Sequence, residues 1–160
     1  AAVGAGASVM YLFVSLFSGV GVGATVCIAQ AFGAGRREQV STVVDTVYRA
    51  ILISALPVML LAFLGAEKLV EWMQVEMEIA PGACTYIRIL GLGLVATVGY
   101  NINDGLLRGL GNSRASLLCL AVATVVNVAL DLLLVTLIPL GVAGVAIATV
   151  IAQLVSWIAA

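Results

Sequence analysis

This sequence is short of charged side chains and contains no histidine. Only 9% of its 160 residues are Asp, Glu, Lys or Arg, whereas 63% are hydrophobic. A soluble domain carries about 25% charged residues, and so few polar side chains do not cover the surface of a soluble domain of this length. The composition therefore predicts an integral membrane protein.

The missing residue types also exclude several functions. Without histidine, neither a serine triad nor a metallohydrolase site can be assembled, so we do not expect an enzyme. Cys27, Cys84 and Cys119 lie in separate apolar stretches without CxxC spacing, which predicts no metal site. The seven basic residues are scattered and the net charge is −1, so we expect no nucleic-acid partner.

Five stretches are long and apolar enough to cross a bilayer, for which a helix needs about 20 residues. The sequence therefore predicts an all-α integral membrane protein with five transmembrane helices. Both ends of the chain lie inside hydrophobic sequence, so we expect a fragment of a longer protein. The five spans cover residues 3–32, 42–66, 84–107, 115–138 and 141–160, and Pro139-Leu140-Gly141 separates the last two.

The charges between the spans predict the orientation of the chain. Arg36 follows the first span, and Arg108 and Arg114 flank the link between the third and fourth spans. Basic residues are retained on the cytoplasmic side of membranes, so we expect these segments to face the cytoplasm. The acidic connection 67–82 would then lie outside. Because Trp72 and other apolar residues alternate with its carboxylates, we expect that connection to lie in the outer membrane interface.

Two groups of residues have more than one interpretation. Gly19 and Gly23 form a GxxxG pattern in the first span, which predicts close helix packing rather than a nucleotide site. Asn101, Asn103 and Asp104 lie near the cytoplasmic end of the third span. We expect water or lipid headgroups to solvate them, and the alternative is a role in gating or in anchoring the loop.

The strongest functional candidate is the pair Asn127 and Asp131. Asp131 is the only charged residue between residues 115 and 160, and a carboxylate at a helix centre costs roughly 2.5 to 3.5 kcal/mol. The i, i+4 spacing places both side chains on one helix face, where their oxygen atoms can bind one cation or a proton. The alternative is a hydrogen bond that only joins two helices.

The turn between the last two spans places other polar residues near this pair. Asp131 and Thr149 lie nine residues before and nine residues after Leu140. Because each residue of a helix rises by about 1.5 Å, an antiparallel hairpin would hold both at the same depth. The same count pairs Asn127 with Gln153, one turn deeper. We therefore expect Asp131, Asn127 and Thr149 to form one polar cluster.

Six short motifs follow one another along the chain. They are GVGAT at 21–25, AQAFGAGR at 29–36, YIRILGLG at 86–93, LRGLGNSR at 107–114, NVALD at 127–131 and GVAGVAIAT at 141–149. In this order they resemble the N-terminal half of the multidrug and toxic compound extrusion family. The Asn-x-x-x-Asp form is most similar to the branch named after DNA-damage-inducible protein F.

This resemblance implies a twelve-helix antiporter of two six-helix lobes. Such a protein lies in the cell (inner) membrane and exports organic cations or amphipathic compounds in exchange for sodium ions or protons. It needs no cofactor other than this coupling ion. Residues 1–160 would supply helices two to six of the N-terminal lobe. The family's cation site maps onto Asn127, Asp131 and Thr149, with Gln153 as a possible neighbour, whereas its first-helix Asp has no counterpart in this sequence.

The resemblance also implies the partners of the chain. They are membrane lipid, a small-molecule xenobiotic, and the missing first helix and C-terminal lobe of the same chain. Substrate cavities of repeat-built transporters lie between the halves, so we do not expect residues 1–160 to transport alone. Two alternatives stay open. One is a lipid-linked oligosaccharide flippase of the same superfamily, and the other is a small channel or structural membrane subunit.

Overall fold

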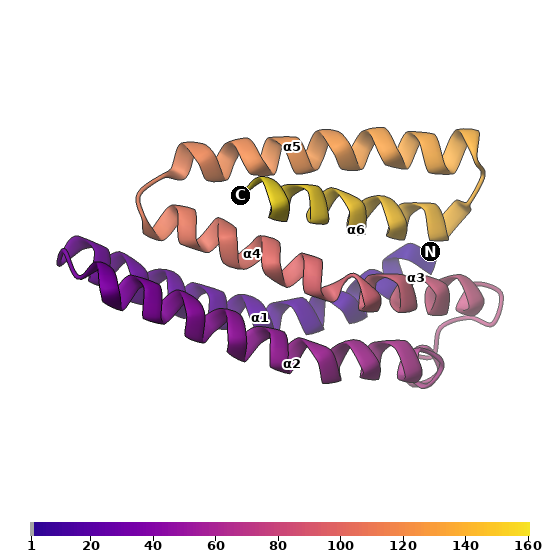
Figure 1. Cartoon of the computed structure of the whole chain (residues 1–160). Coiled ribbons are helices and arrows are strands. Elements are labelled where there is room, and N and C mark those ends of the chain that lie inside the picture. Colours follow the sequence, from indigo (N-terminus) through magenta and orange to yellow (C-terminus); the bar gives the residue numbers. More distant parts are fainter. Residues whose placement is uncertain (1) are drawn as a thin grey trace.

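The computed structural model describes residues 2–160 of the chain, and the described part is entirely helical (Figure 1). Four helices are long and apolar enough to cross a membrane, and the number rises to five if the bent pair α3–α4 is one span. This confirms the predicted all-α membrane fold. The elements are α1 (Ala2–Gly33), α2 (Arg37–Trp72), α3 (Ala80–Leu92), α4 (Leu94–Gly109), α5 (Ser113–Leu132), the π-helical η1 (Leu133–Leu137) and α6 (Gly141–Ala159).

The connections between helices lie at the two ends of the bundle. Figure 1 shows the α1–α2 and α4–α5 turns at one end, and the α2–α3 and α5–α6 connections at the other. The α1–α2 turn contains Gly35 and the α4–α5 turn contains Gly111, and both glycines have positive φ angles, 70° and 80°. Glycine adopts this left-handed conformation without steric cost and so ends a helix sharply. The two connections with arginines in or next to them thus lie at one end of the helix bundle, and the acidic α2–α3 connection lies at the opposite end.

The third predicted span, 84–107, is not one straight helix. It begins earlier, at Ala80, and breaks at Gly93 into α3 and α4, whose axes differ in direction by 53°. At the break, a methyl group added to Gly93 would lie 2.2 Å from a methyl group of Val150 in α6. Only a residue without a side chain lets the bent helix approach α6 this closely.

The second predicted span, 42–66, is part of a longer helix. Helix α2 has 36 residues and ends at Trp72, so the acidic connection expected from residue 67 is helical over its first part. Such a helix is about 54 Å long, well beyond the hydrocarbon core of about 30 Å. Both ends of α2 therefore reach past the apolar layer, and Trp72 at its end is 85% exposed.

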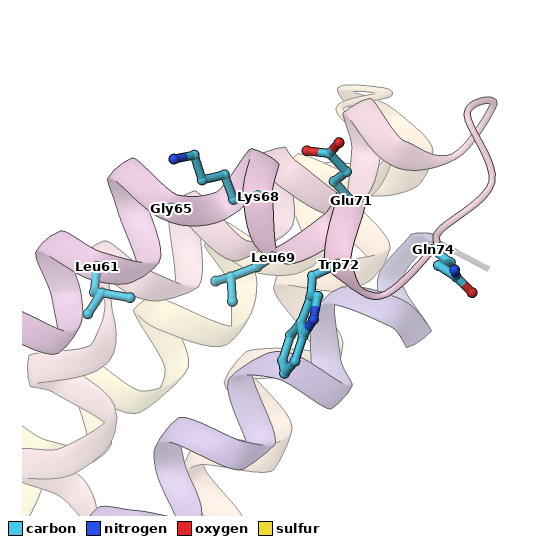
Figure 2. Close-up of a pocket in the computed structure, with 7 residues that line it drawn as sticks. All are labelled: Leu61, Gly65, Lys68, Leu69, Glu71, Trp72 and Gln74. Carbon is cyan, nitrogen blue, oxygen red and sulfur yellow. The ribbon is translucent and has the colours of Figure 1, made fainter.

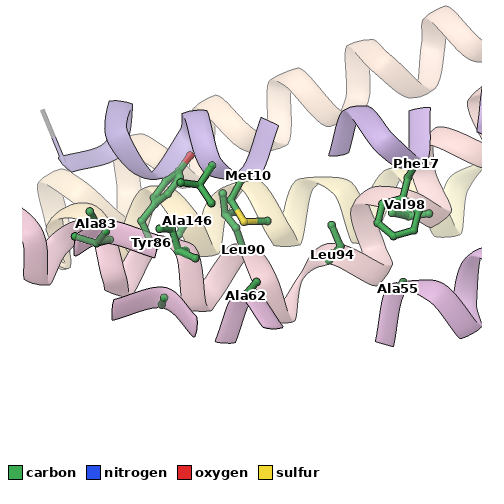
Figure 3. Close-up of a cluster of buried hydrophobic side chains, with 14 of the residues drawn as sticks. Met10, Phe17, Ala55, Ala62, Ala83, Tyr86, Leu90, Leu94, Val98 and Ala146 are labelled. Atoms are coloured by element: carbon green, nitrogen blue, oxygen red, sulfur yellow. The ribbon is translucent and has the colours of Figure 1, made fainter. Parts of the chain in front are cut away.

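The apolar core is built mainly from α1, α2, α3 and α4, and α6 contributes Ala146 (Figure 3). Alanines fill the closest contacts, because Ala55, Ala62, Ala66, Ala83 and Ala146 have no exposed surface. Small residues allow helix backbones to approach closely, which is how membrane helices gain packing energy. Within the described chain, no residue of α5 belongs to this core.

The predicted close packing at Gly19 and Gly23 is wrong for the described residues. A methyl group added at either glycine would meet no described atom within 4 Å. Other glycines make close contacts, among them two on α4: a methyl group added to Gly99 would lie 2.2 Å from the Trp157 ring, and one at Gly105 would lie 2.6 Å from the Thr25 hydroxyl oxygen. A GxxxG pattern predicts a helix face without protruding side chains, but it does not identify the helix that packs against this face.

Candidate functional site

Helices α5 and α6 pair as an antiparallel hairpin and carry the predicted polar cluster (Figure 1). Asn127 on α5 donates a hydrogen bond from its side-chain nitrogen to the Thr149 hydroxyl oxygen on α6, at 3.5 Å. The Thr149 hydroxyl donates in turn to the Val145 carbonyl oxygen one turn earlier, at 2.9 Å. These two bonds set the orientation of the Thr149 hydroxyl group, and the bond to Thr149 is donated by the Asn127 amide nitrogen.

Two side-chain oxygen atoms, one on α5 and one on α6, are buried without a hydrogen-bond partner in the described structure. They are Oδ1 of Asp131 and Oε1 of Gln153. A buried acceptor without a partner is unfavourable, by roughly 1 to 3 kcal/mol for an unpaired neutral group and more for a charged one. Such atoms are acceptors available to a cation, a proton donor or a water molecule.

The register of the hairpin differs from the simple count outward from Leu140. Asn127 contacts Thr149, whereas the count pairs Asn127 with Gln153 and Asp131 with Thr149. The difference arises before the turn, where α5 continues as the π-helical η1 and the Leu140 amide bonds to the Leu134 carbonyl, six residues back. Wider turns use more residues for the same rise, so the α5 arm needs extra residues to reach a given depth.

A cavity of about 180 Å³ lies beside the Asn127–Thr149 bond. Since one water molecule occupies about 30 Å³ in the liquid, the cavity has room for roughly six. Its wall combines polar and apolar side chains from α4, α5 and α6, so it suits small polar or amphipathic ligands. The lining includes Tyr100, Leu120, Thr124, Asn127, Thr149 and Gln153.

Asp104, which we expected to be solvated, is instead buried, with 8% of its surface exposed. Its carboxylate pairs with the Arg108 guanidinium at 2.6 Å and accepts a hydrogen bond from the Ser116 hydroxyl on α5. A buried charge needs such partners. The expectation of interfacial solvation is therefore wrong for Asp104, and its contacts fit the alternative of anchoring the α4–α5 loop.

Asn103 joins three helices that are far apart in the sequence. It accepts a hydrogen bond from the Tyr48 hydroxyl on α2 and donates one to the Trp157 carbonyl on α6, at 3.2 Å. The Trp157 ring nitrogen also donates to the Tyr48 oxygen, at 3.5 Å. The sequence did not indicate this network, because nothing in the local pattern relates residues 48, 103 and 157.

These helices define a multi-pass membrane protein. The MatE family model matches residues 1–133, and the chain therefore belongs to the MatE family, which confirms the resemblance at the level of the family. Since this is a family of transporters, the expectation that the chain is not an enzyme is also confirmed.

Known proteins support the assignment. The chain is 33% identical to the probable multidrug resistance protein YpnP of Bacillus subtilis (strain 168) over 57% of its own length and 20% of that protein. It matches the outward-facing conformation of a multidrug resistance MATE family transporter with a TM-score of 0.92 and 27% identity, over 98% of this chain and 35% of the other. The chain thus spans about a third or less of these proteins.

A further solved MATE structure was obtained in complex with MaD3S. It matches with a TM-score of 0.90 and 28% identity, over 97% of this chain and 35% of the other. A chain of this family therefore binds a ligand. The fold agreement at this identity covers the whole helical arrangement described above, including the α5–α6 hairpin.

Proposed function

We propose that residues 1–160 are the N-terminal lobe, without its first helix, of a secondary active multidrug exporter. The whole protein would exchange organic cations or amphipathic compounds for sodium ions or protons across the cell (inner) membrane. Asp131, Asn127 and Thr149 would bind the coupling ion, with Gln153 as a neighbour. The Asn127-x-x-x-Asp131 form supports the branch named after DNA-damage-inducible protein F.

The observation that carries the proposal is the unpartnered oxygen of Asp131. Its Oδ1 atom is buried and accepts no hydrogen bond from the described residues. A carboxylate whose only purpose was to join helices would be expected to use its oxygens in bonds between them. An ionisable group left without a partner inside the membrane is typically part of an ion or proton path.

The chemistry of these side chains supports exchange. A carboxylate binds either a proton or a cation, so the two compete for Asp131. Small hard cations prefer several oxygen ligands, and the Asn127 and Thr149 side chains offer neutral oxygens one turn away on α5 and on the facing helix. The rest of the transporter would supply the remaining ligands, among them the Asp that the family carries on its first helix.

The substrate class rests on the relatives and on the cavity. YpnP is named a probable multidrug resistance protein, and the cavity beside Asn127 combines the Tyr100 ring and the Leu120 side chain with amide and hydroxyl groups. Such a mixed wall fits compounds with one polar and one apolar part. Because the cavity and the ion site share Asn127 and Thr149, occupancy of one would alter the other.

The test of this proposal is the substitution Asp131→Asn in the full-length protein. The change keeps the shape of the side chain and removes its charge, so we expect drug resistance of expressing cells to be lost while expression stays nearly normal. Asp45→Asn is the matched control, because Asp45 is an exposed acid near the N-terminal end of α2. This substitution should leave drug resistance intact. Full resistance with Asp131→Asn would refute the proposed site.

Counterflow in vesicles of the full-length protein then separates the alternatives. Exchange of drug against sodium ions or protons supports an exporter. Movement of lipid-linked oligosaccharide would indicate a flippase, and passive conductance would indicate a channel.

The proposed orientation has its own test. Single cysteines at positions 37 and 71, in a version without native cysteines, should react with an impermeant thiol reagent from opposite sides, position 37 from the cytoplasm and position 71 from outside. Labelling of position 37 from outside only would reverse the proposed orientation.

A further inference from the structure

The end of α2 carries a groove that the proposed transport function does not use. Its volume is about 680 Å³, and it is lined by Leu61, Gly65, Lys68, Leu69, Glu71, Trp72 and Gln74. In Figure 2 the Lys68 and Glu71 side chains point toward the upper edge of this face of the helix, and the Leu69 and Trp72 side chains point toward its lower edge. The groove therefore runs along one helix and has separate charged and apolar walls.

The position of this groove along the helix corresponds to the headgroup layer of a membrane. Helix α2 has no charged residue from Ala50 to Ala66, about 25 Å of helix at 1.5 Å per residue. Glu67 and Lys68 mark the end of that stretch, and Trp72 follows one turn later. Tryptophan and lysine are favoured at membrane interfaces, where an apolar body and a polar end can both be satisfied.

The order of groups along the groove follows the order of groups in a phospholipid. Leu61 and Gly65 lie on the part of α2 that faces the acyl chains. Lys68 comes next, at the level of the phosphate, and Glu71 lies about 4.5 Å further along the axis. In an ethanolamine phospholipid the ammonium group lies just beyond the phosphate, so each charge of the lipid would meet the opposite charge of the protein.

Lys68 and Glu71 are both available for this role. Each is exposed, and neither takes part in an ion pair within residues 2–160. The neighbouring Glu67 differs, because it already pairs with Arg88 at 2.7 Å. Gly65 leaves the groove open between Leu61 and Lys68, since a methyl group added there would touch only Leu61, at 3.9 Å.

We propose that this groove binds one phospholipid with a primary-amine headgroup, a phosphatidylethanolamine. Lys68 binds the phosphate, Glu71 binds the ammonium group, the Trp72 ring packs beside the headgroup, and the Leu61 side chain contacts the upper acyl chain. The site selects the headgroup through Glu71, because a trimethylated choline amine has no N–H to donate and a glycerol headgroup has no positive charge.

The test is native mass spectrometry of the delipidated full-length protein, titrated with phosphatidylethanolamine, phosphatidylcholine and phosphatidylglycerol of the same acyl chains. We expect phosphatidylethanolamine to bind about fivefold more tightly than phosphatidylcholine, because only the primary ammonium group adds a hydrogen bond to the charge attraction of Glu71, a difference of about 1 kcal/mol. Glu71→Gln should remove this preference without lowering the affinity for phosphatidylglycerol. Lys68→Gln should lower the affinity for each of the three lipids by about fivefold.

The control is Glu78→Gln, which removes an acid of the adjoining loop outside the groove and should leave every affinity unchanged. Unchanged melting temperatures would show that the three variants are folded. Equal wild-type affinity for phosphatidylethanolamine and phosphatidylcholine would overturn the proposal. So would unchanged lipid binding in both Lys68→Gln and Glu71→Gln, the result expected if the rest of the transporter covers the groove.

Discussion

Helix α5 and the α1–α4 region of this lobe are held in place by different interactions. The α1–α4 region packs through apolar side chains and alanines without exposed surface. Helix α5 contributes nothing to that core among the described residues, and its buried residues are Ser116 and Cys119. It is joined to its neighbours by hydrogen bonds at Ser116, Cys119 and Asn127.

This difference has a functional meaning. Helix α5 packs mainly along α6 and takes no part in the core of α1–α4. Hydrogen bonds between membrane helices average about 0.6 kcal/mol, so α5 can exchange those that it makes with α4 and α6 at modest cost. We therefore expect a change of charge at Asp131 to act first on the contact between α5 and α6.

The largest effect on stability is expected in the tightly packed region. Gly99→Ala would place a methyl group against the Trp157 ring, and overpacking of this kind costs roughly 1 to 3 kcal/mol. The melting temperature of the full-length protein in detergent should fall. Gly19→Ala gains the same helix propensity but meets no described atom, so it should not lower the melting temperature. Equal destabilisation by both variants would contradict the comparison.

An intermediate effect is expected where α5 meets α4. Ser116→Ala removes the hydroxyl that donates to the buried Asp104 carboxylate. Hydrogen bonds to charged groups contribute roughly 1.5 to 3 kcal/mol, of which we expect the lower part because Arg108 still pairs with Asp104. Thermal unfolding measures this loss. No change in melting temperature would mean that Arg108 alone satisfies the carboxylate.

The smallest effect is expected where α5 meets α6. The Ser156 hydroxyl is fully buried and donates to the Cys119 carbonyl at 3.0 Å, so Ser156→Ala should cost about 1 kcal/mol. Ser54→Ala is the control, because the Ser54 hydroxyl bonds only within its own helix. A loss with Ser156→Ala as large as that with Gly99→Ala would show that this hydrogen bond contributes as much to stability as the close packing of α4 against α6.

Much of this fold could be predicted from the sequence because apolar length is a strong requirement for crossing a membrane. The spans followed from that requirement, and the described helices contain four candidate spans, or five if the bent pair is one span. The break at Gly93 did not follow, because its cause is the close approach of Val150, which lies far along the chain. Burial of Asp104 was missed for the same reason, since its partner Ser116 lies on the next helix.

Part of the candidate cluster was predictable from the sequence, but its register was not. The scarcity of polar groups in α5 singled out Asn127 and Asp131, and the count from Leu140 added Thr149 and Gln153. The structure brings Asn127 and Thr149 together. The pairing of Asn127 with Thr149 depends on the π-helical η1 segment, and the apolar sequence of that segment does not differ from an ordinary helix. Their part in ion coupling stays a prediction.

The most direct test of the central claim is substrate-driven counterflow of sodium ions and protons in vesicles that contain the full-length protein. The account predicts that an imposed drug gradient drives one of these ions across the membrane of wild-type vesicles, and that Asp131→Asn abolishes this ion movement while Asp45→Asn preserves it. Ion movement of equal size with Asp131→Asn and wild type would contradict the claim that Asp131 binds the coupling ion.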